Sequence, residues 1–83
     1  MTLERLKAAK HRTIGTKQTV KALARGQVQV AFIAADAEDR VTRDIRRLAA
    51  EKQVQIVMVE TMVALGKACG IEVGAAAAAI LKE

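Results

Sequence analysis

Two short, nearly continuous apolar runs separated by one amphipathic segment constrain the fold of this chain more than any other feature. The first run extends from Val28 to Ala35 and the second from Val54 to Val59. Runs of this length without polar alternation are typical of strands covered on both faces. The segment between them ends near Lys52 and repeats apolar side chains at helical spacing, namely Val41, Ile45, Leu48 and Ala49. We therefore predict a strand, a helix and a second strand.

Two helical patterns precede this unit. The first covers residues 3–10, carries two leucines at helical spacing and can take Thr2 as its cap. The second runs from about Lys17 to Arg25, and Gly26 stands where a left-handed cap would end it. Its apolar face consists of Val20, Leu23 and Ala24. Residues 11–14, between the two patterns, are predicted to form a brief extended link.

One further helical pattern and one ambiguous segment follow the unit. Thr61 can cap a helix that ends at Gly70. Its apolar face consists of Met62, Leu65, Ala68 and Cys69. The segment from Ala75 to Ala79 is ambiguous, because alanine has the highest helix propensity while a thin sheet layer can also use small residues. Propensity alone favours a helix there.

The alternation of strands and helices determines the fold class that we expect. It implies right-handed crossovers and a sheet with helices on both faces. We therefore predict an α/β fold, a single-domain three-layer α/β/α sandwich with a small mixed sheet, formed by residues 1–83. A chain of this size buries only about 60% of the surface of its unfolded state, so its stability depends on a tight core. The composition agrees, since 52% of the residues are hydrophobic and most of these are aliphatic.

The charge is concentrated at one end of the sequence. Residues 1–25 carry seven bases and one acid, whereas residues 26–83 carry seven bases and eight acids. Such a distribution indicates a surface that faces a polyanion. An ordinary solvated basic face would give the same count, so charge alone leaves both interpretations open.

The inventory of reactive side chains argues against catalysis. The chain has no serine, its one histidine (His11) lies in the basic segment, and Cys69 has no recognisable base partner. One histidine and one cysteine far apart offer no zinc-type spacing, and Gly15 belongs to no phosphate-binding loop motif. We therefore expect no enzyme, no metal and no cofactor. Because no apolar stretch is typical of a signal peptide or a membrane span, we expect a cytoplasmic protein.

Asp36, Glu38 and Asp39 form an acidic cluster after the first apolar run. Carboxylates gathered in this way can hold magnesium. They also precede a predicted helix, whose positive N-terminal end favours acidic side chains. We prefer the second interpretation.

The start of the helix predicted at Lys17 has an unusual charge. Acidic residues are favoured in a first turn, because the first four backbone N–H groups and the helix dipole make that end positive. This chain instead places Lys17 and Lys21 there, after Gly15 and Thr16. With Thr16 as the cap, both lysines are left to meet an anion such as a nucleic-acid phosphate, and Gln18 can read a base edge. The alternative is that both lysines are ordinary exposed side chains.

The aromatic content limits how a nucleic acid can be bound. Phe32 is the one aromatic residue and lies within an apolar run, so no platform is available for stacking successive unpaired bases. We therefore expect recognition of a folded RNA by its shape, with hydrogen bonds from a helix end and apolar contacts to extruded bases.

Three stretches of the sequence carry a resemblance to a known family. They are Gly15-Thr16-Lys17-Gln18-Thr19-Val20-Lys21, Ala34-Ala35-Asp36-Ala37-Glu38 and Leu65-Gly66-Lys67-Ala68-Cys69-Gly70-Ile71. In these stretches the chain resembles the kink-turn-binding family of archaeal and eukaryotic ribosomal proteins, and the similarity covers nearly the whole chain. The short length and the Lys17-Gln18 pair look most like the bacterial YbxF-type members of that family.

The resemblance implies an α/β/α sandwich that binds the sharply bent kink-turn and inserts its glycine-led helix start at the tandem sheared G·A pairs. The residues that match the family's contacts to guanines and backbone are Gly15, Thr16, Lys17, Gln18 and Lys21. Glu38 would lie near an adjacent base. A nucleotide flipped out of the bulge would pack against Ile71, Glu72 and Val73. The resemblance also implies a strand for the alanine-rich tail, Ala75 to Ile80, which we adopt against propensity.

This chain departs from the family pattern in one important place. The usual Asn-Glu pair is replaced by Lys17-Gln18, so a neutral amide stands where a carboxylate normally accepts a hydrogen bond from guanine. Charge-assisted hydrogen bonds are about twice as strong as neutral ones, so we expect weaker or altered discrimination, partly offset by the extra lysine.

We expect a monomeric protein that binds structured RNA containing a kink-turn and associates with the ribosome. The alternative is a ribosome-associated protein-interaction adaptor with only non-specific RNA affinity. Its acidic partner would meet the helix face formed by Arg40, Arg43, Arg46 and Arg47.

Overall fold

A computed structural model of this chain describes residues 3–82. Eight elements follow one another in alternation, beginning with a helix. The helices are α1 (Leu3–Ala8), α2 (Thr16–Ala24), α3 (Asp39–Glu51) and α4 (Met62–Ala68). The strands are β1 (Arg12–Ile14), β2 (Val28–Ala34), β3 (Gln55–Val59) and β4 (Ala77–Leu81).

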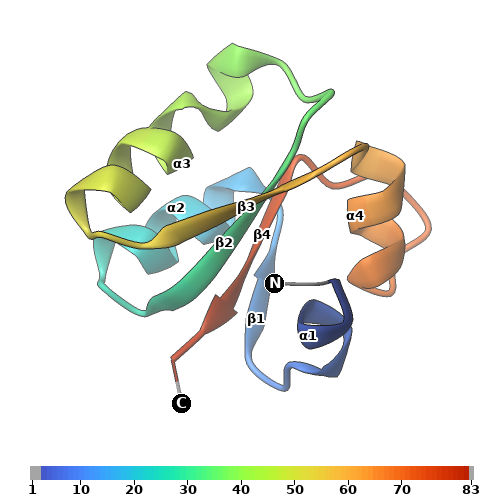
Figure 1. Ribbon diagram of the computed structural model, residues 1–83, viewed down its shortest axis with the longest axis horizontal. Coiled ribbons are helices and arrows are strands. Elements are labelled where there is room, and N and C mark those ends of the chain that lie inside the picture. Colours follow the sequence, from blue (N-terminus) through green and yellow to red (C-terminus); the bar gives the residue numbers. More distant parts are fainter. Residues whose placement is uncertain (1–2, 83) are drawn as a thin grey trace.

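The strands form one mixed sheet in the order β1-β4-β2-β3 (Figure 1). β2 and β3 are parallel and are joined through α3, whereas β4 is antiparallel to both β1 and β2. Helices α2 and α3 cover one face of this sheet, and α1 and α4 cover the other (Figure 1). The predicted three-layer sandwich with a small mixed sheet is confirmed.

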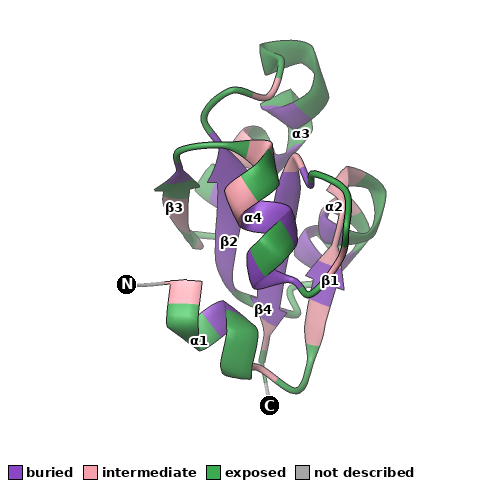
Figure 2. Cartoon of the chain, turned by 90° about the vertical axis from the view of Figure 1, so that its right-hand side faces the viewer, coloured by how far each residue is buried: buried purple, intermediate pink, exposed green. Residues whose placement is uncertain are grey.

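Two apolar clusters fill the spaces between these layers. One cluster joins Leu23 of α2 and Ile45 of α3 to the sheet, and the other joins Leu6 of α1 and Leu65 of α4 to it. Phe32 belongs to the second cluster and is completely buried. Successive residues of β2 contribute to opposite clusters because side chains alternate along a strand. The buried strand predicted from the first apolar run is therefore confirmed, and Figure 2 shows β2 and β4 buried beneath α4.

The alanine-rich tail forms a strand in the middle of the sheet. β4 lies between β1 and β2, and Ala77, Ala78 and Ala79 are each 0% exposed. Small side chains suit this place because helices cover both faces of the strand, so tertiary packing overrides the helix propensity of alanine. The strand implied by the family resemblance is confirmed, although it begins at Ala77 rather than Ala75.

β3 differs from its prediction. We expected a strand covered on both faces, but β3 lies at the edge of the sheet and only Val59 in it is buried. Met58 is 56% exposed. The apolar pattern predicted the strand correctly and its surroundings wrongly, because an apolar run does not specify how many neighbours a strand has.

The helix ends show which capping predictions hold. Gly26 has a φ of 71°, which confirms its left-handed conformation, and the Thr61 hydroxyl accepts a hydrogen bond from the Ala64 N–H at 3.0 Å, which confirms that cap. α1 ends at Ala8 rather than near residue 10. Thr2, the cap predicted for α1, lies outside the described residues.

The buried faces of α2 and α3 are rotated from those predicted. Ala24 and Val41 were expected in the core but are exposed, and Thr19 and Thr42 are buried instead. A threonine can enter a core when its hydroxyl is bonded. Thr19 meets this condition, because its hydroxyl lies 2.8 Å from that of Thr13 on β1.

The predicted link over residues 11–14 contains strand β1, which side chains join to three helices. The Thr13–Thr19 hydrogen bond joins β1 to α2. Arg12 donates from Nη1 to the Leu6 carbonyl at 3.0 Å and from Nη2 to the Cys69 carbonyl at 2.9 Å. These carbonyls belong to the C-terminal ends of α1 and α4, where carbonyls are left without the usual i+4 partner. The Leu6 carbonyl also accepts from the Ala9 N–H at 3.3 Å. None of the helices within residues 3–82 is long and apolar enough to cross a membrane.

Candidate nucleic-acid interface

Three segments that are far apart in the sequence meet at one end of the sheet. The Gly15 N–H donates to the Ala77 carbonyl at 2.8 Å, and the Ala34 N–H donates to the Ala76 carbonyl at 2.9 Å. The ends of β1 and β2 therefore lie beside the start of β4 (Figure 1). The start of α2, the loop that contains Glu38 and the loop of residues 71–74 all adjoin the sheet at this end. We call this end of the molecule the candidate interface.

Gly15 determines how α2 begins. It is the N-cap residue, and its φ of 96° lies in the region that favours glycine. The first intrahelical bond runs from the Thr19 N–H to the Gly15 carbonyl at 3.2 Å, so the N–H groups of Thr16, Lys17 and Gln18 have no intrahelical acceptor. The prediction that Thr16 caps the helix is wrong, because Thr16 is already its first helical residue and the N-cap glycine has no side chain.

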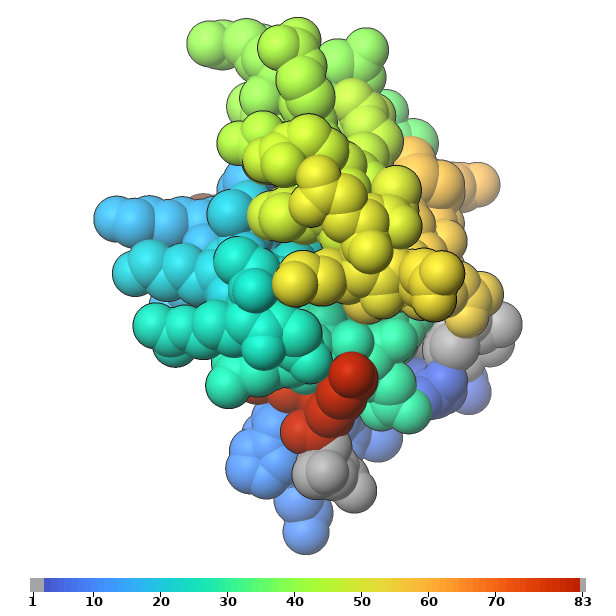
Figure 3. Space-filling view, turned by 90° about the vertical axis from the view of Figure 1, so that its left-hand side faces the viewer, coloured from blue at the N-terminus to red at the C-terminus, as the bar shows by residue number. Residues whose placement is uncertain are grey.

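The first turns of α2 present positive charge. Lys17, Gln18 and Lys21 are exposed, and the first turn contains no acid. Neither lysine has an ion-pair partner in the part of the chain that the structure describes. Figure 3 shows long side chains of the α2 segment projecting into solvent beside α3. The Thr13–Thr19 hydrogen bond holds the buried face of α2 to β1, so the position of these charged side chains relative to the sheet is fixed at the helix.

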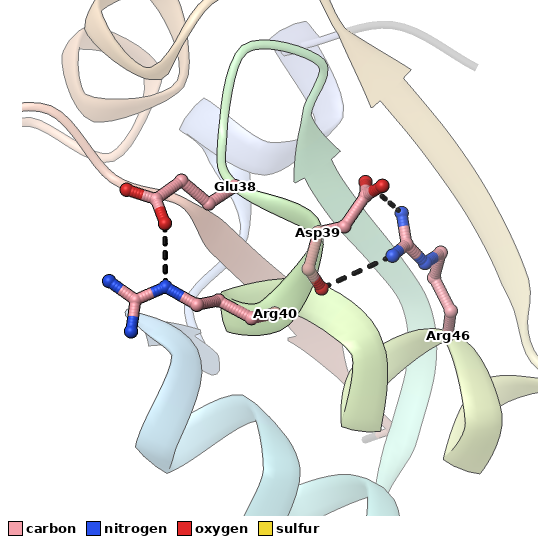
Figure 4. Close-up of polar contacts among 4 residues, drawn as sticks. All are labelled: Glu38, Asp39, Arg40 and Arg46. Atoms are coloured by element: carbon pink, nitrogen blue, oxygen red, sulfur yellow. Dashed lines mark hydrogen bonds and ion pairs between the residues drawn. The ribbon is translucent and has the colours of Figure 1, made fainter.

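The acidic cluster divides its carboxylates among three partners. Asp36 accepts a hydrogen bond from the Met62 N–H at 2.8 Å. Glu38 pairs with Nε of Arg40 at 2.6 Å, and Asp39 pairs with Arg46 at 3.3 Å (Figure 4).

These contacts show for which residues the helix-end interpretation holds. Among residues 3–82, no three acidic, histidine or cysteine side chains are grouped so that they could hold a metal ion. The helix-end interpretation holds for Asp39, which lies in the first turn of α3. Glu38, the N-cap residue of α3, caps no N–H with its side chain, and Asp36 caps α4 instead.

The loop of residues 71–74 combines a fixed backbone with an exposed apolar side chain. Its ends are held by hydrogen bonds from the Ile71 N–H to the Gly66 carbonyl at 3.1 Å and from the Ala75 N–H to the Met62 carbonyl at 3.0 Å. Its backbone packs so closely on α4 that a Cβ at Gly66 would lie 2.1 Å from the Val73 carbonyl oxygen. Ile71 is half-buried, Glu72 is exposed and Val73 is 70% exposed.

Asp36 and Gly66 hold two loops of the candidate interface, and Arg12 joins β1 to the ends of α1 and α4. None of these roles was predicted. A glycine inside a helical pattern is a usable signal of close backbone approach, and Gly66 is such a residue. The bonds of Asp36 and Arg12 go to backbone atoms 26 and 57 positions away in the sequence, which no local pattern reveals.

The arginine face of α3 is largely neutralised within the chain. Arg40 and Arg46 pair with the acids described above, and Arg47 lies 3.6 Å from Asp44 and 3.4 Å from Glu51. Of the four arginines, Arg43 alone has no such partner within residues 3–82. These pairs weaken the attraction that the face can exert on an acidic protein.

Cys69 is a buried thiol rather than a reactive one. Burial raises the pKa of Cys69, and the nearby Arg12 guanidinium opposes this effect only in part. Because the thiolate is the nucleophilic form of cysteine, a raised pKa keeps this side chain inert at neutral pH.

The whole chain matches a known family. Residues 1–83 match the model of the ribosomal protein L7Ae/L30e/S12e/Gadd45 family. This chain belongs to that family. The L7Ae family is non-enzymatic, so the expectation that the chain is not an enzyme is confirmed.

Relatives of this L7Ae-family chain are similar to it over its full length. An RNA-binding protein of Bacillus pumilus (strain SAFR-032) is 51% identical over 81 residues, which are 98% of this chain and 99% of that protein. RNA-binding protein YbxF of Geobacillus stearothermophilus is 42% identical over 82 residues, which are 99% of this chain and 100% of that protein. The predicted resemblance to the YbxF-type members is confirmed.

A solved structure supports the L7Ae-family fold independently. The 15.5kD RNA binding protein of Giardia lamblia superposes with a TM-score of 0.86 at 26% identity. The superposition covers 98% of this chain and 68% of the Giardia chain.

Proposed function

We propose that this RNA-binding protein of the L7Ae family recognises kink-turns in structured RNA and stabilises their bent form. The observation that carries the proposal is the meeting of three segments at the candidate interface. One segment offers hydrogen-bond donors and positive charge, one offers a carboxylate and one offers an apolar side chain. A folded RNA with an exposed base can use all three.

In this proposal the start of α2 meets the tandem sheared G·A pairs. The N–H groups from Thr16 to Gln18 and the helix dipole favour a phosphate, and Lys17 and Lys21 add charge. The amide of Gln18 donates and accepts at a base edge. Nothing lies within 4 Å of the place where a Cβ of Gly15 would stand, so the backbone itself is open to close approach.

Glu38 and the loop of residues 71–74 complete the contact surface. Arg40 occupies one oxygen of Glu38, and the other oxygen can accept a hydrogen bond from an adjacent base. Val73 and half-buried Ile71 offer apolar contact to a flipped nucleotide, with exposed Glu72 between them. Because Phe32 is completely buried, aromatic stacking is not available, which favours a folded RNA over a single strand.

The protein acts by binding rather than by chemistry. A ligand that prefers the bent form of an RNA shifts its conformational equilibrium toward that form. We propose that residues 1–83 act as one domain, as a monomer and in the cytoplasm. Ribosomal RNA is the first target to test, because the family is named after ribosomal proteins.

The adaptor hypothesis has less support from the structure. Three of its four arginines are already paired within the chain. Pull-down of a protein partner that survives nuclease treatment would favour this hypothesis over RNA binding.

Binding at one fixed, near-physiological salt concentration tests the proposal. The two RNAs are a kink-turn and the same duplex with its G·A pairs converted to Watson–Crick pairs. We expect clear preference for the kink-turn. Equal binding to both would refute the proposal and leave only a generic basic surface.

Lys17→Ala and Lys21→Ala test which surface makes the contact. Each phosphate contact contributes roughly 0.9 to the slope of log affinity against log salt, so each variant should bind more weakly and flatten the slope by about one. Lys52→Ala is the matched control, because Lys52 is an exposed lysine at the C-terminal end of α3, away from the candidate interface. Unchanged affinity and slope in both α2 variants would contradict this assignment.

A further inference from the structure

Asp36 joins two segments of the candidate interface by a contact inside the protein. It lies two residues before Glu38 and accepts a hydrogen bond from the N–H of Met62, the first residue of α4, at 2.8 Å. The Met62 carbonyl in turn accepts from the Ala75 N–H at 3.0 Å. The Met62 Cβ lies 3.1 Å from the place where a Cβ of Gly74 would stand. A continuous series of contacts therefore runs from the Glu38 loop through Met62 to the loop of residues 71–74.

We propose that Asp36 is a positioning residue for RNA recognition. Its carboxylate fixes the start of α4, and with it the separation between the Glu38 loop and the loop that presents Val73. The inference rests on the proposed function, in which these two loops contact neighbouring nucleotides of one folded RNA. A surface that is ordered before binding loses less conformational freedom when the ligand arrives, so its affinity is higher.

The start of α4 has two side-chain acceptors that do different things. Thr61 belongs to the helix it caps and bonds the Ala64 N–H, so it stabilises α4 locally. Asp36 comes from the segment after β2, so its bond holds α4 to another part of the chain. The tie between the two loops should therefore depend on Asp36.

Electrostatics and positioning predict opposite effects of removing Asp36. Asp36 is an exposed acid beside a surface that we propose for a polyanion, so loss of its charge alone should strengthen binding. Loss of its hydrogen bond should weaken binding to the kink-turn. Asp36→Ala removes both charge and acceptor, whereas Asp36→Asn removes the charge and keeps an oxygen that can accept from Met62. The difference between these equally charged variants isolates the hydrogen bond.

The experiment compares the affinities of the wild type and of both Asp36 variants for the kink-turn and for the Watson–Crick duplex. The salt is fixed, and the temperature is one at which thermal unfolding shows every variant to be folded. We expect Asp36→Ala to bind the kink-turn about five-fold more weakly than Asp36→Asn, which is the effect of one net hydrogen bond. Both variants should bind the duplex equally. Asp39→Ala is the control, because Asp39 is a nearby exposed acid in the first turn of α3 whose carboxylate bonds Arg46 rather than α4. This variant should bind as the wild type or more tightly.

The outcomes separate this inference from the function on which it rests. If the wild type prefers the kink-turn and the two Asp36 variants bind it equally, the positioning by Asp36 is overturned and the proposed function stands. An equal loss on both RNAs would indicate general damage to the fold and would also overturn the inference. If the wild type itself shows no preference, the proposed function fails first.

Discussion

Replacement of Gly66 by alanine has two opposite effects on the stability of the fold, a favourable one on the helix and an unfavourable one on packing. Alanine in a helix interior is about 1 kcal/mol more favourable than glycine. At this buried site, however, the new Cβ would lie 2.1 Å from the Val73 carbonyl oxygen and 3.2 Å from the Gly74 Cα, whereas real Cβ contacts essentially never fall below 3.0 Å. The backbone at Val73 must therefore move by close to an ångström.

The packing effect should be the larger of the two. Overpacking a well-filled site costs typically about 1–3 kcal/mol, and the upper end applies here because the obstacle is a backbone carbonyl that cannot rotate away. About 3 kcal/mol, less about 1 kcal/mol gained in helix propensity, leaves a net loss of about 2 kcal/mol. For a domain of this size each kcal/mol lowers Tm by about 4–8 °C, so Tm should fall by roughly 10 °C.

Thermal unfolding and kink-turn binding measure the two consequences of this substitution. Gly74→Ala is the matched control, because its Cβ would meet the Met62 Cβ at 3.1 Å, a contact that a small shift relieves. We expect less than about 1 kcal/mol from it. Gly66→Ala should also weaken kink-turn binding below its Tm, since Val73 has moved. A raised Tm, or a smaller loss than in Gly74→Ala, would refute the reasoning.

Two further predictions concern β1 and the buried thiol. Arg12→Met keeps the aliphatic stem and removes both hydrogen bonds to the ends of α1 and α4, so the free energy of unfolding measured with urea should fall by about 2 kcal/mol. Arg43→Met is the control, because Arg43 is exposed and has no ion-pair partner within residues 3–82. An equal loss in both variants would contradict this prediction. Burial raises the pKa of Cys69, so the unfolded chain ionises first as pH rises. Stability is therefore unaffected by this thiol below its ordinary pKa and falls above it. A pH profile of Cys69→Ala that shows the same alkaline decline would rule out this origin.

The fold could be predicted where a local pattern and its surroundings agree. The apolar run of β2 required two covered faces and has them, and the alternation of elements led directly to the layered arrangement. The edge position of β3 could not be predicted, because the sequence of a strand does not reveal which strands pair with it. The alanines of β4 show the reverse case, in which local propensity favours a helix and neighbouring strands decide otherwise.

The candidate interface also combines a feature that local patterns predict with features that depend on long-range contacts. The glycine-led, lysine-rich start of α2 is a local feature and is legible in seven consecutive residues. The contacts that hold the other two loops are long-range: Asp36 reaches Met62, and Gly66 makes room for the backbone at Val73. A rule for local sequence patterns cannot detect such pairs. Local patterns therefore indicate the residues that we propose to face RNA, but not those that hold the loops in place.

The central position of β4 also governs the order in which the chain can assemble. Among the described strands, β1 pairs with β4 alone, although the two stand at opposite ends of the sequence. During synthesis, β2, α3 and β3 emerge as a contiguous unit whose strands pair with each other. β1 and the Gly15 turn can form their backbone hydrogen bonds to β4 only after β4 has emerged from the ribosome. A nascent chain from which β4 has not yet emerged therefore lacks the complete candidate interface.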